Sequence, residues 1–260
     1  MNRSARTQGL HGTEAVCGAR ELAREEINSV DVGCAWLAAA DDSGEVQIAT
    51  LDAWDAPRAA HRTLRRGHTN LASCVRLRPG RETEVVSAGA DCRLVHWDAA
   101  RLGQLGVHDL GAAEAASPAA SNQMINPPMA HTLLLTRQGD TAVVARGDGH
   151  VSTHRLGRAR AARRGPARRA GPAPASAGPA QAALLPEPHS AAATSLAWLG
   201  EDLIVSGGND GRLMLRALDG AGPRLVHRHG PKLNALCALG PAVVAAADTT
   251  ATLTLYRVPA

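Results

Sequence analysis

The feature that most constrains this chain is a strand–turn–strand pattern that recurs five times. Its clearest copy spans residues 203–216 (LIVSGGNDGRLMLR), where apolar residues alternate at period two on both sides of a glycine- and asparagine-containing turn. The other copies are centred on Val46, Leu94, Val151 and Leu253. Measured between the first apolar residues after the turns, the spacings are 48, 57, 62 and 40 residues. The repeat predicts a series of small antiparallel sheets, with insertions in the two longest intervals.

A second periodic element is a histidine placed just before an apolar strand. It occurs at His68, His131, His189 and His229. The second copy of the repeat also carries a serine, an aspartate and a tryptophan, and together these residues resemble the buried, hydrogen-bonded tetrad of WD-repeat proteins. The fourth copy has an arginine where the tryptophan would be, so the resemblance implies that packing or solvent replaces this corner. The residues that match the tetrad are His68, Ser87, Asp91 and Trp97, and then His189, Ser206 and Asp210.

The resemblance to WD-repeat proteins implies an all-β fold, a β-propeller of about five four-stranded blades. We expect one propeller domain over residues 25–256. Blades that derive from a seven-bladed ring would form an open arc with two exposed ends, and we favour that arrangement over a closed ring. The blades are expected at residues 26–52, 67–98, 129–156, 189–217 and 229–256. Residues 1–24 are expected to be an N-terminal tail, or else the remnant of a preceding blade.

Within the WD-repeat proteins, the chain resembles the WD repeat-containing protein 53 family. The similarity is carried by runs such as EEINSV, AAADDSGEVQI, INPPMAH, SGGNDGRLML and ADTTATLTLY, in the same order as in that family. The family has two further N-terminal blades that find no counterpart here, and its basic insertion lies nearer the C-terminus. The resemblance implies a substrate receptor of the cullin-four RING ubiquitin ligases, docked through their damage-binding adaptor protein.

Docking in such receptors is associated with a WDxR box after the third strand of a blade. The nearest match here is Trp97-Asp98-Ala99-Ala100-Arg101, which is one residue longer. We therefore take Asp98 and Arg101 as the candidate docking residues for this partner.

Composition and motifs argue against catalysis and against a membrane. The chain contains no GxSxG, GxxxxGK[ST], HExxH or GxGxxG motif, which predicts a protein that is not an enzyme and has no catalytic residues and no cofactor. His227 and His229 suggest a metal site, but one histidine per repeat fits the tetrad better, so we expect no metal. No apolar run reaches about 18 residues, and the N-terminus has no apolar leader. The five cysteines are scattered, which is typical of an intracellular protein of the cytoplasm or nucleus.

Residues 157–188 form an insertion rich in arginine, proline and alanine, with no apolar period. Such a composition cannot bury a core and predicts disorder. A solvated linker is favoured, and the alternatives are a nuclear-import patch and an arm that binds nucleic-acid phosphates. No aromatic residue is interleaved for base stacking, which argues against specific recognition of single strands. A binding assay titrated with salt would separate the linker from the nucleic-acid arm. The candidate anion-binding residues are Arg158, Arg160, Arg163, Arg164, Arg168 and Arg169.

The predicted disorder can be tested by limited proteolysis. Trypsin should cut first between residues 158 and 169, because the arginines there are expected to be accessible whereas those in the blades are held in strands. Mass spectrometry of the first fragments identifies the cleavage sites. If the blades were cut while this run stayed intact, the segment would be docked rather than disordered.

Overall fold

The structure, a computed structural model, describes residues 21–51, 61–81, 83–112, 126–157 and 182–258. Within these ranges the chain forms 19 strands and no helix. The strands make five antiparallel sheets, each built from strands consecutive in the chain, so the predicted all-β class and the five-blade repeat are confirmed. Four of the described sheets have four strands, and the fifth has three.

The strands of each blade follow one another across the sheet in chain order. The first blade contains β1 (Ile27–Val32), β2 (Trp36–Asp41), β3 (Val46–Thr50) and β4 (Arg62–Leu64). The second contains β5 (Ala72–Leu77), β6 (Glu84–Gly89), β7 (Arg93–Asp98) and β8 (Gly103–Asp109). The third contains β9 (Ala130–Leu135), β10 (Thr141–Arg146), β11 (Val151–Arg155) and β12 (Ala182–Leu184). The fourth contains β13 (Ala193–Trp198), β14 (Leu203–Gly208), β15 (Arg212–Ala217) and β16 (Leu225–Arg228), and the fifth β17 (Leu233–Ala238), β18 (Val243–Asp248) and β19 (Leu253–Arg257).

The outer strand of each four-stranded blade lies outside the range drawn for that blade from the sequence. β4 and β12 have three residues each and β16 has four, and these three strands follow connecting segments that are longer than the tight hairpin turns of the repeat. The prediction of disorder over residues 157–188 needs correction at its C-terminal end. There β12 pairs with β11, and Leu185 is buried against the next blade. Residues 158–181, with all six candidate arginines of the arm, lie outside the described residues.

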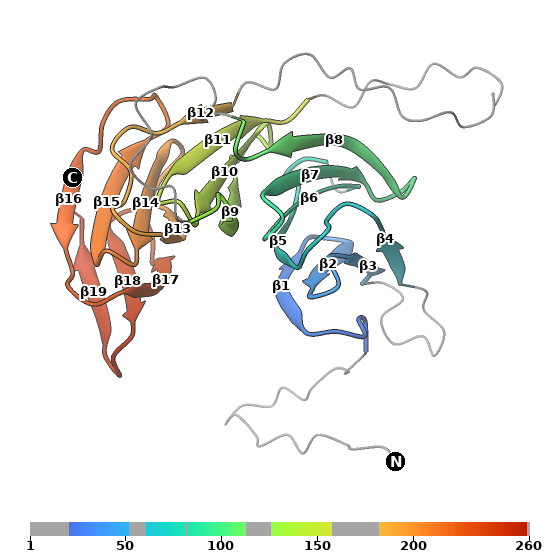
Figure 1. Cartoon of the computed structure of the whole chain (residues 1–260), viewed down its shortest axis with the longest axis horizontal. Helices are drawn as coiled ribbons and strands as arrows, with labels where there is room; N and C mark the ends of the chain where they lie inside the picture. The colour runs from blue at the N-terminus through green and yellow to red at the C-terminus, as the bar shows by residue number, and fades with distance from the viewer. Residues whose placement is uncertain (1–20, 52–60, 82, 113–125, 158–181, 259–260) are drawn as a thin grey trace.

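The five blades are arranged along a curved, open arc (Figure 1). The first strands of successive blades contact one another in order, from β1 through β5, β9 and β13 to β17. In Figure 1 the first and fifth blades lie at the two ends of the arc and do not pack together. The expected incomplete ring is therefore the arrangement observed.

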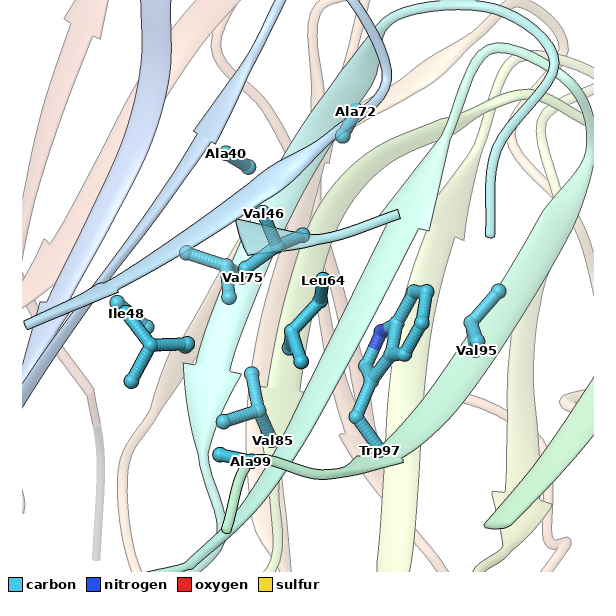
Figure 2. Packing of buried hydrophobic residues seen from close by; sticks show 11 residues of the cluster. Ala40, Val46, Ile48, Leu64, Ala72, Val75, Val85, Val95, Trp97 and Ala99 are labelled. Carbon is cyan, nitrogen blue, oxygen red and sulfur yellow. The ribbon is translucent and has the colours of Figure 1, made fainter. Parts of the chain in front are cut away.

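The core consists of apolar layers between neighbouring blades. Figure 2 shows the layer between the first and second blades, where the indole of Trp97 lies beside Leu64 and Val95. Trp97 is only 1% exposed, and Leu64 from the outer strand of the first blade is fully buried. Because most other side chains in these layers are Ala, Val and Leu, this tryptophan supplies a large share of the apolar area buried in its layer.

Burial along a strand depends on whether its blade has two neighbours. All six residues of β6 are buried, because the second blade is covered on both faces. In β18 only every second residue is buried, since one face of the fifth blade has no covering sheet among the described residues. On that face Leu253 and Leu255 of β19 are 66% and 60% exposed. At the other end of the arc, Val32 of β1 is 57% exposed.

The N-terminal segment covers part of the outer face of the first blade. Leu22 is buried against Ala39 and Ala49, whereas most of the other described residues that precede β1 are exposed. Residues 1–20, which make up most of the expected tail or blade remnant, lie outside the described residues. Within the described ranges, no helix has the length and hydropathy needed to cross a membrane.

Glycines in the hairpin turns set how closely neighbouring blades approach. Gly149 and Gly211 follow the turn residue of the third and fourth blades and have φ values of 90° and 69°. An added Cβ would collide with the backbone of the next loop, at His189 and Gly230 respectively. Both the left-handed conformation and the close approach therefore require glycine.

The open end of the arc can be tested by thiol reactivity. Cys74 and Cys237 lie on the same face of their respective sheets, but the third blade buries Cys74 whereas Cys237 is exposed. N-ethylmaleimide should modify Cys237 in the native protein as fast as exposed Cys34. Cys74 should react roughly 100-fold more slowly if opening of its layer costs about 3 kcal/mol. Peptide mass spectrometry gives the rates, and protection of Cys237 equal to that of Cys74 would show that another surface covers this face.

Candidate functional site

The residues singled out by the repeat form a buried hydrogen-bond chain in the second blade. The indole Nε1 of Trp97 donates to Ser87 Oγ at 2.8 Å, and Ser87 Oγ lies 2.8 Å from His68 Nε2. His68 Nδ1 lies 2.9 Å from Asp91 Oδ1. The carboxylate of Asp91 also accepts the backbone N–H groups of Thr69 and Arg93. The chain thus ties the loop before β5 to the β6–β7 turn and to β7.

The directions of these hydrogen bonds define the protonation state of His68. Asp91 can only accept, so Nδ1 of His68 carries a proton, and the neutral ring then accepts the Ser87 hydroxyl proton at Nε2. Burial lowers the pKa of His68, which favours this neutral form even though Asp91 opposes the shift. The hydroxyl of Ser87 therefore donates to His68 and accepts from Trp97.

The fourth blade repeats this arrangement with a different fourth member. His189 contacts Asp210 at 2.9 Å and Ser206 at 3.0 Å, and Nε of Arg216 donates to Ser206 Oγ at 3.0 Å. The expectation that packing or solvent would replace the tryptophan was therefore wrong, because the guanidinium makes the bond that the indole makes in the second blade. Only 1% of Arg216 is exposed, and this burial lowers its pKa.

Arg216 also binds the segment that joins the third blade to the fourth. Its Nη1 donates to the Pro186 carbonyl at 2.6 Å, and its Nη2 donates to the Glu187 carbonyl at 2.7 Å. A tryptophan has one N–H donor and could not make these bonds. Arg216 therefore does more than complete the tetrad: it also holds the described end of the long insertion against the fourth blade.

In the third blade, an arginine at the end of a strand takes the place of the loop histidine that the second and fourth blades have. Arg146 stands at the position that Gly89 and Gly208 occupy in the second and fourth blades, where an added Cβ would lie within 3.0 Å of the histidine and aspartate side chains. Arg146 is buried and donates to both carboxylate oxygens of Asp148, which in turn accepts the backbone N–H of His150. No histidine occupies the loop position in this blade, so the arginine has the necessary space.

His131 had been grouped with the loop histidines, but it lies within β9. The polar interior of the third blade contains another histidine, His154, whose Nε2 lies 2.8 Å from Ser152 Oγ. Burial, with His108 and Arg146 nearby, lowers the pKa of His154 to about 3. Nothing in the hairpin pattern predicted this pair, although a serine two residues before a histidine within a buried strand could have indicated it.

The first and fifth blades use a carboxylate at the position of Gly89. In the first blade Asp41 accepts from Gln47 at 3.1 Å, and Thr63 donates to Gln47 at 2.8 Å. In the fifth blade Asp248 lies 2.7 Å from Nε2 of His229, whose Nδ1 contacts the Tyr256 hydroxyl.

The ring of His227 packs edge-on against Tyr256, with the ring centroids 4.9 Å apart. Across the described part of the chain, no group of three or more His, Cys, Asp or Glu side chains is placed to hold a metal ion.

The candidate docking residues lie in the β7–β8 turn. Asp98 is 7% exposed, accepts the backbone N–H of Arg101 at 3.0 Å, and pairs with its guanidinium at 2.7 Å. The Arg101 side chain is 72% exposed. The extra residue of the WDxR-like box therefore lies in a turn that is held by the hydrogen bond between Asp98 and the backbone of Arg101. The Arg101 side chain points to solvent.

Comparisons with known proteins identify the repeat. No family model matches the chain. The WD repeat-containing protein 53 homolog of Dictyostelium discoideum is 27% identical over 142 residues, which cover 49% of this chain and 37% of the relative. The alignment thus spans well under half of the relative's length. The crystal structure of the RRP9 WD40 repeats superposes with a TM-score of 0.63 at 16% identity, over 89% of this chain and 62% of the other. The chain therefore has the WD40-repeat fold, and about half of it is similar in sequence to the WD repeat-containing protein 53 homolog.

The structural importance of Arg216 can be tested by truncation. Arg216→Ala should lower the free energy of unfolding by about 3 kcal/mol, because it leaves the buried Ser206 hydroxyl and two carbonyl groups without a donor. Arg212→Ala, at a 38% exposed neighbour in the same strand, is the matched control and should cost less than about 0.5 kcal/mol. Urea denaturation followed by circular dichroism measures both. Equal effects of the two substitutions would refute the assigned role.

Proposed function

We propose that this chain is a non-catalytic protein-interaction scaffold and serves as a substrate receptor of a cullin-four RING ubiquitin ligase. In this proposal the β7–β8 turn, with Asp98 and Arg101, docks the damage-binding adaptor of the ligase. The scaffold part is supported by the WD40 fold, in which rigid stacked sheets offer faces and loops for recognition. The ligase part is supported by the partial homology with WD repeat-containing protein 53 and by the geometry of the turn.

The observation that argues most directly against catalysis is the state of the two Ser–His–Asp sets. Ser87–His68–Asp91 and Ser206–His189–Asp210 have the hydrogen-bond order of a hydrolytic triad. However, both serines are fully buried, and each hydroxyl accepts a further bond, from Trp97 in one blade and from Arg216 in the other. A substrate carbonyl could not reach either oxygen without unfolding the blade. These sets therefore act as structural ties.

The proposed docking turn has the properties of a recognition element. Asp98 is buried and fixes the backbone of the turn, so the exposed guanidinium of Arg101 projects from a rigid support. Arginine in such a position can make bidentate bonds to carboxylate or carbonyl groups of a partner at a small cost in conformational entropy. Arginines are also enriched among the residues that dominate binding energies.

Adaptor binding provides the test of this proposal. Wild-type protein should retain the purified adaptor at micromolar concentration, and Arg101→Ala should weaken retention about tenfold or more. The thermal midpoint should fall only slightly, because the Arg101 side chain is 72% exposed and the buried Asp98 carboxylate keeps its bond from the backbone N–H of residue 101. Arg137→Ala is the matched control, since Arg137 is another exposed arginine in an ion pair, with Glu201. No retention by wild type would exclude the receptor role and leave a scaffold for other proteins.

A further inference from the structure

The fifth blade differs from the other four in that its third strand forms the edge of the described sheet. β4, β8, β12 and β16 each cover the third strand of their blades, whereas no described strand pairs with the outer side of β19. The Val258 N–H donates to the Ala242 carbonyl on the β18 side. The backbone groups of Leu253, Leu255 and Arg257 therefore point away from β18, towards the open edge.

An apolar cavity lies beside this edge. It has a volume of about 100 Å³ and is enclosed between the outer part of the fourth blade and the third strand of the fifth. The fourth blade contributes Leu225 and His227 of β16 to its lining, and the fifth contributes Tyr256 and Val258. In the second blade the corresponding strand, β7, is paired with the outer strand β8. The cavity of the fifth blade therefore lies next to a third strand that no described outer strand covers.

We propose that β19 is a docking edge for an extended peptide of a partner protein, which adds a fourth strand to the fifth blade. Strand addition uses the outward N–H and C=O groups for affinity, and alternate side chains of the peptide for specificity. Side chains on one face of the peptide would enter the cavity, which has room for one aliphatic group. Side chains on the other face would cover the exposed Leu253 and Leu255. The inference rests on the proposed scaffold function and assigns it a second surface.

The charge at the open edge further restricts the partner. Arg257 is exposed and lies on the same face of β19 as Leu253 and Leu255, because alternate residues of a strand share a face, and it forms no ion pair within the described ranges. An acidic side chain or a terminal carboxylate on the peptide would pair with this guanidinium. The peptide that fits best is therefore an extended segment with alternating apolar residues and a carboxylate at the end that meets Arg257.

The proposal can be tested by selection from a display library of random octapeptides on the full-length protein. We expect enriched peptides with alternating apolar residues and a carboxylate, and fluorescence anisotropy of synthetic copies should give saturable binding. Hydrogen exchange at Leu255 and Arg257 should slow when the peptide is added. No enrichment above the uncoated surface would overturn the proposal, whether the edge rejects peptides or another part of the chain already occupies it.

Two substitutions separate this edge from other surfaces. Leu225→Lys places a charge at the cavity and should weaken peptide binding at least tenfold, whereas the matched control Val107→Lys, on the exposed outer strand of the second blade, should not. Arg257→Pro removes one outward N–H and the charge, and should also weaken binding. Binding that survives both Leu225→Lys and Arg257→Pro would refute the edge. Arg101→Ala should leave peptide binding intact, so loss of the adaptor interaction and loss of the peptide interaction can be told apart.

Discussion

Every blade of this protein depends on a neighbouring sheet to cover its apolar faces. The side chains available for the core are mostly Ala, Val and Leu, so a single sheet of 17 to 25 strand residues buries too little area to be stable alone. When the sheets stack, the apolar side chains of two neighbouring sheets cover each other in one layer. For this reason the second blade is buried on both faces, whereas the fifth, at the end of the arc, retains apolar residues on its outer face.

Stacked sheets create a second requirement, which is that the polar groups at each hairpin turn find partners away from water. The blades satisfy it with different residues at the same positions. Where the loop supplies a histidine that faces a turn aspartate, the adjacent sheet position is Gly89 or Gly208. Where the loop lacks the histidine, Arg146 takes the space and pairs with Asp148. Because an unsatisfied buried group costs about 1–3 kcal/mol, each blade needs some such solution, but not one particular set of residues.

The sequence was sufficient to predict the repeat, because a hairpin with period-two strands and a glycine turn is encoded within about 14 residues. The outer strands could not be predicted in the same way. β12 is only Ala182–Leu184, and its position is set by pairing with β11 and by burial of Leu185 in the next layer. These are contacts between segments far apart in the chain, for which the local pattern holds no information.

The tetrads were only partly predictable for a related reason. The resemblance to WD repeats indicates which residue type is usual at each of the four tetrad positions. By that criterion, an arginine at the tryptophan position predicts an incomplete tetrad. The geometry shows that Arg216 has the reach to bond Ser206 and two carbonyl groups of the preceding connection at once. Sequence similarity records which residue is usual at a position, whereas hydrogen-bonding capacity decides which other residues can replace it.

The same stacking explains where recognition can occur. Side chains within the layers are committed to packing or to buried hydrogen bonds, which leaves turns and strand edges for partners. The β7–β8 turn belongs to the second blade and the β19 edge to the fifth, and Figure 1 shows the third and fourth blades between them. A rigid arc that carries two surfaces on separate blades can hold two partners without overlap. The proposed receptor role requires this separation, because a single shared surface would make substrate and ligase compete.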